Sequence, residues 1–570
     1  MMNMKNLIRK ARPLQALLCA SALAALTACS SNDDEIPQLS AAKPGTLAAC
    51  ETLKTSFTAS GLVISASTRV VAGTLTVGGQ PVGAHCLVTA KLGERVGAVD
   101  GQTYAIQFEM RMPEAWNGRF LYQANGGLDG NVNTAAGGFG GGPLTNALRQ
   151  GFAIISSDAG HTAAQNPSFG VDPQARLDFG YQTVAKLTPL AKNLVVAAYG
   201  RGPDRSYFAG CSNGGRHALV ATSRFAADYD GILAGAPGWQ LPKAAIANIF
   251  GAQRYASVAT NPADISTAFT LAERRVLSAA VVARCDALDG ATDGQVQDTA
   301  ACQARFSLAN DVPTCTGARD GTCLSAAQKT AIAPIFSGAT TSDGRSFYST
   351  FPYDSGHGGG GIAFWEFTAP VALDSGAVGF VFGSPPQAVT GFNGPVFALT
   401  ASIDALVASI TASGGLYTES GMQFMTPPNP GKLNALRDRG AKVLVYHGVS
   451  DPIFSADDTK AWLGAVMANH SDATQFARYF PVTGMGHCSG GPATDQMDLL
   501  TPLVAWVEQG NAPERIVATA RGAGNAGGVN ADLPTNWSAA RTRPLCPWPQ
   551  VARFKGSGDI EVESSFDCRI

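Results

Sequence analysis

The chain has 570 residues, a formal net charge of −2 at pH 7 and only 15% charged residues. This near-neutral balance excludes the dense basic surface typical of nucleic-acid-binding proteins, so we expect no nucleic-acid partner. With 45% hydrophobic residues and 65 glycines, the composition excludes an intrinsically disordered chain and is typical of a large globular protein with many loops.

The first 28 residues have the pattern of a lipoprotein-type export signal. A basic stretch precedes the apolar residues 14–26, which are too few to span a bilayer comfortably. The sequence Leu-Thr-Ala-Cys that follows resembles a bacterial lipobox and would make Cys29 the lipidated first residue of the mature protein. An ordinary secretory signal that is cleaved nearby is the alternative.

These features predict an exported protein that is periplasmic, extracellular or held at the outer membrane. Residues 29–49 are the predicted tether. The lipid on Cys29 is the only membrane contact that we expect, because no later segment offers about 20 continuous apolar residues.

The cysteines also favour export. Apart from Cys19 in the signal and Cys29, ten cysteines remain, and an even number is typical of disulfides formed in an oxidising compartment. Short spacing favours three local pairs and leaves two more, although the local pairs rest on proximity alone and other pairings stay open: Cys285–Cys302, Cys315–Cys323, Cys546–Cys568, Cys50–Cys86 and Cys211–Cys488.

From about Tyr104 the chain alternates between strand-like and helix-like segments. This rhythm predicts a mostly parallel sheet with helices on both faces. The predicted strands cover residues 105–112, 119–123, 152–157, 206–209 and 230–237, and a helix covers 215–225.

The rhythm stops near Pro237 and resumes about 200 residues later. The intervening residues are rich in Gly, Ser and Pro, which predicts a loop-rich insertion. Strands at 442–448 and 477–482 and a helix at 499–509 follow. We therefore predict an α/β catalytic domain made of residues 50–236 and 437–570, interrupted by a lid domain at 237–436.

The segment Gly210-Cys211-Ser212-Asn213-Gly214 fits the G-x-S-x-G elbow of serine hydrolases. The pattern alone is weak in a glycine-rich chain, but a predicted strand precedes it and a predicted helix follows it, as the elbow requires. The N-terminus of that helix favours developing negative charge. Ser212 is therefore the predicted nucleophile, and a simple helix cap is the alternative.

An acid and a histidine follow Ser212 in the order that α/β-hydrolases use. Asp451 comes just after the strand at 442–448, and His487 lies in a turn after the strand at 477–482. Ser212 would attack an ester carbonyl, His487 would take and return its proton, and Asp451 would orient the imidazolium. The backbone N–H groups of Asn213 and Gly127 are the predicted oxyanion donors.

Two other sets of residues compete for these roles. His161 and Asp158 precede the elbow, which is the wrong chain order, so they are interpreted as loop structure. Asp457 and Asp458 are alternative acids, but they lie farther along the loop than Asp451.

Cysteines flank both predicted catalytic residues. Cys211 directly precedes Ser212, and Cys488 directly follows His487. A nucleophile and its base must approach within hydrogen-bond reach, so their neighbours would come close enough for a disulfide. The two dipeptides therefore predict a catalytic pair with a covalent link across it.

The segment 285–295 carries Asp286, Asp289 and Asp293 within eight residues. Calcium prefers carboxylate and carbonyl oxygens, and three close carboxylates would otherwise repel one another. The spacing differs from that of an EF-hand, and a solvated Asp/Gly turn is the equal alternative.

At the elbow, continued by Gly215-Arg216, and at the turn 484–491 the chain resembles the tannase and feruloyl esterase family. The resemblance extends from Cys50 to Cys568 and includes the link between the two catalytic dipeptides. It implies an α/β-hydrolase fold with an inserted lid. It also implies a structural Ca²⁺ held by the three aspartates and by the carbonyls of Ala291 and Gln295.

The lid differs from one branch of this family. The stretches 541–547 and 555–560 resemble those of a hydrolase of a terephthalate monoester, in which a lid arginine binds the free carboxylate. Here no Arg or Lys occurs at 346–431, and the segment 374–380 takes the corresponding place. The resemblance implies ring contacts from Phe454, Phe380 and Trp365. Because a buried carboxylate without a partner is costly, we expect neutral aromatic acyl groups.

Together these features predict a serine carboxylesterase that hydrolyses small aromatic acid esters through an acyl-enzyme. Feruloyl, galloyl and terephthalate monoesters are the candidate substrates, and Ca²⁺ is the only expected cofactor. The alternatives are a true terephthalate-monoester hydrolase, an acyltransferase, and a catalytically inactive surface binding protein built on the same scaffold.

Overall fold

The computed structural model describes residues 36–141 and 146–570, so the predicted signal and the lipidation site Cys29 lie outside the described residues. Residues 38–570 belong to one unit. Within the described part of the chain, no single helix is long and apolar enough to cross a membrane. Among the described residues, one pair of helices is long and apolar enough when the two are taken together: α10 (Gly394–Thr400) and α11 (Ile403–Thr411). The chain bends by 107° between them.

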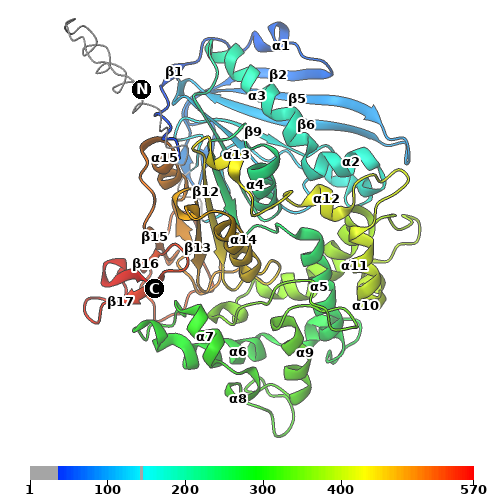
Figure 1. Ribbon diagram of the computed structural model, residues 1–570, viewed down its shortest axis with the longest axis vertical. Coiled ribbons are helices and arrows are strands. Elements are labelled where there is room, and N and C mark those ends of the chain that lie inside the picture. The colour runs from blue at the N-terminus through cyan, green and yellow to red at the C-terminus, as the bar shows by residue number, and fades with distance from the viewer. Residues whose placement is uncertain (1–35, 142–145) are drawn as a thin grey trace, which may run out of the picture. The chain divides into compact units, whose positions relative to one another are not determined.

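A nine-stranded sheet forms the centre of this unit (Figure 1). Neighbouring strands from β13 to β9 run parallel, whereas β6, β5 and β2 are antiparallel to their neighbours. The mostly parallel sheet is therefore confirmed. In spatial order the strands are β13 (Ala477–Val482), β12 (Lys442–Gly448), β11 (Gly231–Gly235), β10 (Arg205–Cys211), β8 (Arg119–Gln123), β9 (Ala153–Ser157), β6 (Thr103–Pro113), β5 (His85–Val96) and β2 (Leu62–Val70).

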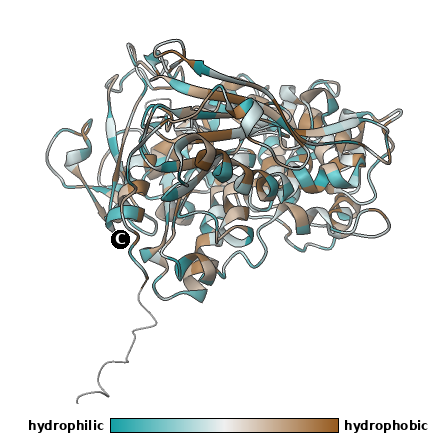
Figure 2. Ribbon diagram, turned by 90° about the horizontal axis from the view of Figure 1, so that it is seen from above, coloured by the Kyte–Doolittle hydropathy of each residue, from teal (hydrophilic) through white to brown (hydrophobic). Residues whose placement is uncertain are grey.

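The parallel strands are covered on both faces. Every residue of β9, β11 and β12 is buried, as expected for such strands. Helix α15 packs Leu503 and Trp506 into one cluster with Tyr207 and Leu233 of the sheet. Figure 2 shows helices with both hydrophobic and hydrophilic stretches, the pattern of helices that bury one side. The long helices of this domain are α3 (Thr183–Tyr199), α4 (Asn213–Arg224), α14 (Ala456–Asn469) and α15 (Leu500–Gln509), and the short ones are α1 (Leu53–Ser56) and α2 (Pro173–Leu177).

The N-terminal part of the domain differs from the prediction. The long strands β2 and β5 were not predicted, although residues Cys86 to Lys91 of β5 alternate between buried and partly buried. The predicted tether is wrong beyond residue 37. Gln38 Nε2 donates to the Val507 carbonyl over 2.9 Å, and β1 (Gly45–Thr46) pairs with β7 (Ala115–Trp116). Paired backbone groups hold this segment on the catalytic domain.

The insertion between β11 and β12 contains helices that were not predicted, separated by long irregular segments such as 312–325 and 337–354. Most of its helices are short, and side chains cap many of them, as Thr270 and Glu273 do in a capping box at α6. Short capped helices leave little periodicity to detect in the sequence. The helices of the insertion are α5 (Leu241–Ala256), α6 (Leu271–Cys285), α7 (Thr299–Arg305), α8 (Leu308–Asp311), α9 (Ala326–Phe336), α10, α11, α12 (Gly421–Met425) and α13 (Asn434–Arg437).

Three π-helical segments continue one another inside this lid: η7 (Phe364–Thr368), η8 (Pro370–Asp374) and η9 (Ala377–Phe382). Buried Arg176 of the catalytic domain holds their C-terminal end, donating to the carbonyls of Phe380 and Gly383. Rare π-helical turns occur frequently at functional sites.

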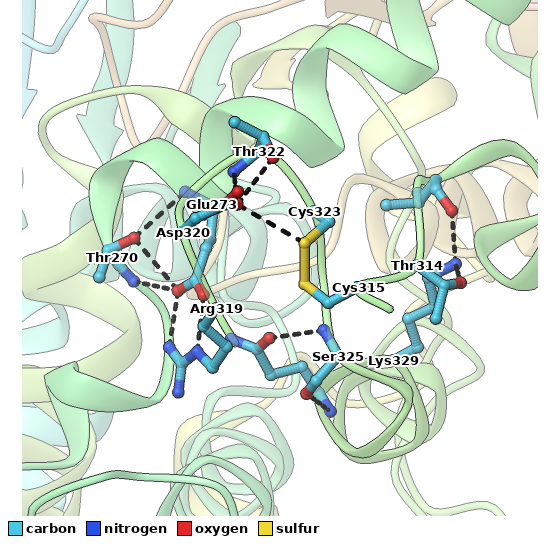
Figure 3. The surroundings of a disulfide bond; sticks show 12 residues. Thr270, Glu273, Thr314, Cys315, Arg319, Asp320, Thr322, Cys323, Ser325 and Lys329 are labelled. Atoms are coloured by element: carbon cyan, nitrogen blue, oxygen red, sulfur yellow. Dashed lines mark hydrogen bonds and ion pairs between the residues drawn. A yellow bond between two sulfur atoms is a disulfide. The ribbon is translucent and has the colours of Figure 1, made fainter. Parts of the chain in front are cut away.

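All five predicted disulfides are present. Figure 3 shows Cys315–Cys323 in the lid, where it closes a small loop. Arg319 of that loop pairs with Glu273, which also caps the start of α6. The charge pair thus ties this loop to α6, and the disulfide closes the loop itself.

Small antiparallel ribbons complete the C-terminal part. They are β14 (Gln496–Met497), β15 (Ile516–Thr519) and β16 (Thr542–Leu545) in one sheet, and β17 (Val551–Phe554) with β18 (Phe566–Arg569) in another. The Cys546–Cys568 disulfide links β18 to the residue after β16.

Candidate active site

Ser212 lies at the sharp turn between β10 and α4. Its backbone has φ 64° and ψ −127°, a strained conformation for a residue with a side chain. A Cβ atom on Gly210 would lie 2.6 Å from the Gly214 carbonyl carbon, and one on Gly214 would lie 2.5 Å from the Ala124 oxygen. The elbow therefore requires both glycines, and it projects the Ser212 hydroxyl from the end of the sheet.

The structure brings Ser212, His487 and Asp451 together. His487 Nε2 lies 2.7 Å from Ser212 Oγ, and His487 Nδ1 lies 2.7 Å from Asp451 Oδ2. Each residue follows a parallel strand of the sheet: β10, β13 and β12 respectively. The carboxyl ends of adjacent parallel strands meet at one edge, where such sheets place their sites.

Asp451 is held by four donors. Its Oδ1 accepts from the backbone N–H groups of Ile453 and Phe454, at 3.0 and 3.1 Å. Burial alone would raise the pKa of Asp451, but His487 and then His447 hold that pKa well below its usual range. The carboxylate is therefore ionised and can orient the imidazole and stabilise its cation.

His447 is a contact that the sequence prediction missed. Its Nε2 lies 3.2 Å from Asp451 Oδ2, and its Nδ1 lies 2.8 Å from Thr459 Oγ1. It is fully buried on β12, four residues before Asp451. A histidine on the same strand just before the predicted acid is the signal that could have found it.

The cysteines that flank this pair are joined. The Cα atoms of Cys211 and Cys488 lie 6.1 Å apart, within the range of a disulfide. The bond connects the residue before Ser212 to the residue after His487, as the flanking cysteines predict.

The predicted oxyanion residues lie beside Ser212. Gly127 and Asn213 line the same pocket as Ser212, and a Cβ on Gly126 would lie 3.6 Å from the Ser212 Cβ. Among the described residues, neither the Gly127 nor the Asn213 backbone N–H has a hydrogen-bond acceptor. Two free donors beside a hydroxyl suit a developing oxyanion.

A buried polar network connects the two halves of this oxyanion pair. Asn213 Nδ2 donates to Asp129 Oδ2 over 2.8 Å, and Arg216 Nε donates to Asn213 Oδ1 over 2.6 Å. Asp129 lies two residues after Gly127, and its carboxylate also contacts His217 Nε2 at 3.2 Å. The Asn213 side chain thus ties the elbow to the Gly127 loop.

The competing residues have other roles. His161 Nε2 donates to the Leu128 carbonyl over 2.8 Å, and no hydrogen bond joins His161 to Asp158. Asp458 accepts from Gln240 Nε2, and Asp457 accepts from Thr350. None of these aspartates contacts His487, so the structure brings neither competing set into the constellation.

A pocket with about 380 Å³ of free space opens at Ser212. The predicted aromatics Trp365 and Phe454 line it, with ring centroids 4.8 and 5.3 Å from the His487 ring. Phe380 is not in the lining. It packs on Phe392 at 4.6 Å, because residues two apart in a π-helix face nearly opposite sides and Phe382 takes the pocket side.

Most of the lining is apolar and was not predicted. It comes from the Gly127 loop, α5, the π-helical segments and the loop after Asp451. The residues are Leu128, Leu241, Leu373, Ala377, Phe382 and Ile453, together with the carboxyl of Asp374. A mostly apolar pocket with few polar groups is typical of small-molecule sites.

The predicted calcium loop lies in the lid after α6. Asp286, Asp289 and Asp293 are all buried, and Asp289 Oδ2 has no hydrogen-bond partner. Burial and then the other two carboxylates raise the pKa of Asp289 to about 7. Asp293 pairs with Arg543. Among the described residues no three His, Cys, Asp or Glu side chains form a ready metal-ligand group. The donor chemistry nevertheless fits a hard cation, since Gln295 Oε1 is also buried and unpartnered.

Comparisons with known proteins agree with this geometry. Residues 86–569 match the family described as "Tannase and feruloyl esterase". The chain is 40% identical over 524 residues to the mono(2-hydroxyethyl) terephthalate hydrolase of Piscinibacter sakaiensis, an alignment that covers 85% of this chain and 84% of that protein. It is 29% identical over 479 residues to a probable feruloyl esterase B-1 of Neosartorya fischeri, covering 81% and 82%.

Solved structures show the same fold. Feruloyl esterase B from Aspergillus oryzae superposes with a TM-score of 0.73 at 24% identity and covers 91% of this chain and 99% of its own. A tannin acyl hydrolase from Aspergillus niger superposes with a TM-score of 0.62 at 18% identity, covering 90% and 93%.

Proposed function

The chain belongs to the tannase and feruloyl esterase family and is a carboxylic ester hydrolase of the α/β-hydrolase fold, and we propose that Ser212, His487 and Asp451 are its catalytic triad. The observation that carries this assignment is the pair of 2.7 Å contacts on the two nitrogens of His487. One nitrogen faces the nucleophile and the other faces an ionised carboxylate, which fixes the tautomer that a general base needs.

The reaction follows from these contacts. His487 Nε2 removes the proton of Ser212 as Oγ attacks the ester carbonyl, and the N–H groups of Gly127 and Asn213 stabilise the oxyanion. His487 then gives its proton to the leaving alcohol, which leaves an acyl-enzyme. Water attacks this ester with His487 again as the base, and the aromatic acid departs.

The pocket supports a small aromatic acyl group. Aromatic and aliphatic side chains form most of its lining, and neither lysine nor arginine is among the lining residues. We therefore favour acids that carry no free carboxylate. A true mono(2-hydroxyethyl) terephthalate hydrolase is the second candidate, favoured by the 40% identity to the Piscinibacter sakaiensis enzyme.

Calcium is a structural cofactor in this proposal. Asp286, Asp289 and Asp293, with the carbonyls of Ala291 and Gln295, would hold the ion, and the bound ion would offset the repulsion among the carboxylates. The support is Asp289 Oδ2 and the side-chain Oε1 of Gln295, two buried oxygens of this loop that have no hydrogen-bond partner. A chelator should lower the melting temperature, and added Ca²⁺ should restore it. A melting temperature that does not change would refute calcium as a structural cofactor.

Export is supported by the five disulfides, which are typical of oxidising compartments. We propose that the protein is held at the bacterial surface or in the periplasm by a lipid on Cys29. Replacing Cys29 with Ser should release the protein from the membrane fraction without a change in its esterase activity.

Purified protein should hydrolyse methyl ferulate, methyl gallate and mono(2-hydroxyethyl) terephthalate at measurable but unequal rates. Ser212→Ala should reduce kcat by about 10⁴-fold or more while the melting temperature stays close to that of the wild type. Residual turnover within tenfold of the wild type would exclude Ser212 as the nucleophile. A protein that binds these esters without cleaving them would be the inactive binding protein. Ester exchange on adding an alcohol would identify an acyltransferase.

A further inference from the structure

One polar side chain of the acyl pocket takes no part in the triad or the oxyanion site. Asp374 ends the π-helical segment η8 and lines the same pocket as Ser212. Only 4% of its surface is exposed. Its pocket neighbours include Leu373, Ala377 and Phe382, so the carboxyl lies in apolar surroundings.

The two oxygens of Asp374 differ. Oδ2 accepts a hydrogen bond from Asn248 Nδ2 of α5 over 3.1 Å. Oδ1 accepts no hydrogen bond from any described residue, and it is not one of the fully buried oxygens. The free oxygen is therefore available to a group inside the pocket.

No cation compensates this carboxyl. No ion pair forms between Asp374 and any described residue, and neither lysine nor arginine lines the pocket. Burial consequently raises the pKa of Asp374 to about 7, while the Asn248 hydrogen bond opposes the rise. Keeping such a group in a catalytic pocket is costly unless a ligand uses it, because a buried polar group needs a hydrogen-bond partner.

We infer that Asp374 is a specificity-determining residue that accepts a hydrogen bond from a hydroxyl group on the acyl ring and disfavours a ring that carries a free carboxylate. The inference rests on the proposed esterase function and deepens it. A phenolic hydroxyl donates to Oδ1 and completes the hydrogen bonds of the carboxyl. A terephthalate carboxylate has no proton to donate, and above pH 7, where Asp374 is ionised, it adds a like charge in an apolar pocket.

The expected discrimination is the value of one hydrogen bond to a carboxyl group, about 10- to 100-fold in kcat/KM. The test compares four substrates: methyl 4-hydroxycinnamate, methyl 4-methoxycinnamate, methyl cinnamate and mono(2-hydroxyethyl) terephthalate. Methylation removes the donor but adds a methyl group, and the ring of methyl cinnamate carries neither oxygen nor methyl, so the three cinnamates together separate the hydrogen bond from the added bulk. Because each ratio is taken within one variant, a general loss of activity cancels.

Wild-type protein should prefer the hydroxylated ester over its methoxy analogue by about 10-fold or more, and Asp374→Leu should bring that ratio close to one. Asp374→Asn keeps an acceptor but removes the charge, so it should retain part of the preference and raise kcat/KM for the terephthalate ester. Leu373→Ala is the matched control, because it alters the shape of the same pocket and leaves the carboxyl in place. Its hydroxy-to-methoxy ratio should stay like that of the wild type.

The outcomes distinguish a failure of the Asp374 role from a failure of the proposed esterase function. If the wild type cleaves all four esters equally well, or if Asp374→Leu keeps the full preference for the hydroxylated ester, the role of Asp374 is refuted while the esterase stands. If the wild type cleaves none of the aromatic esters, the proposed function itself fails. The wild-type and Asp374→Asn measurements decide the question even if the leucine variant does not fold.

Discussion

The edge of the sheet and the lid contribute to the active site in different ways. At the sheet edge, hydrogen bonds of 2.7 Å, a strained elbow and a disulfide fix Ser212 and His487. The lid supplies π-helical segments and mostly apolar side chains that meet at a pocket. The first region is specified by a few irreplaceable residues, whereas the second is specified by shape. The sheet edge therefore determines the reaction, and the lid determines the ester.

The largest effect should come from the triad acid. Asp451→Asn should lower kcat by about 10⁴-fold, because an amide cannot stabilise the His487 cation and favours the wrong tautomer. Asp457→Asn is the matched control. That aspartate lies six residues away on α14, accepts from Thr350 and does not contact His487, so its kcat should stay within about twofold of the wild type. Steady-state kinetics on one chromogenic ester measure both. Similar losses in the two variants would remove Asp451 from the triad.

The next effect tests the network beneath the oxyanion donors. Asp129→Asn should reduce kcat by about 10-fold, a fraction of the 10²–10³ lost with a whole donor, since the Asn213 side chain would lose its carboxyl acceptor while the Asn213 backbone N–H stays in place. KM should change little, because the oxyanion forms only in the transition state. A loss seen only in KM, or a fall in melting temperature with normal kcat, would show that Asp129 is purely structural.

How much of this site could be predicted depends on the region. Ser212, Asp451 and His487 could be found because a motif, chain order and strand ends all point to them. Their partners are harder to find: His447 is indicated only by its place on the strand just before Asp451, and Asp129 becomes a neighbour of Asn213 only through the tertiary structure. They carry no motif of their own.

The lid was predicted least well for a physical reason. Most of its helices are short and capped, and its π-helical turns change which residues face the pocket, so no simple period survives. Phe380 was predicted to contact the substrate ring, but Phe382 is the residue that lines the pocket. The pocket lining also combines segments from Gly127 to Phe454, and only the tertiary structure brings these together.

One disulfide at the sheet edge and one in the lid allow the two regions to be compared directly. Replacing both Cys211 and Cys488 with Ala opens a loop of 277 residues, whereas replacing Cys315 and Cys323 opens one of 8 residues. Chain-entropy arguments give a loss of about 5–6 kcal/mol for the first pair and about 2.5 kcal/mol for the second. Only the first should also lower kcat several-fold, because it borders Ser212 and His487. Denaturant melts and kinetics on both double variants measure this, and equal kcat values would mean that the link does not position the pair.

The smallest expected effect is on the melting temperature, and it comes from the protonation of Asp374 in the lid pocket and not from the triad. The folded protein keeps the Asp374 proton up to a pKa of about 7, while an unfolded chain releases it near 4. Between pH 4 and pH 7 the folded state holds a proton that the unfolded state has released, so the free energy of unfolding falls as the pH rises across this range. The stability that this proton contributes is fully present below pH 4 and is lost as the pH rises through 7. Asp374→Asn has no such proton. Its melting temperature relative to the wild type should therefore rise by a few degrees, on the order of 3 °C, between pH 4 and pH 8. Other buried carboxyls are common to both proteins and cancel in the difference. A difference that is flat across this range would mean that Asp374 is already ionised in the folded protein, and the pocket would then require a cation that the described lining does not contain.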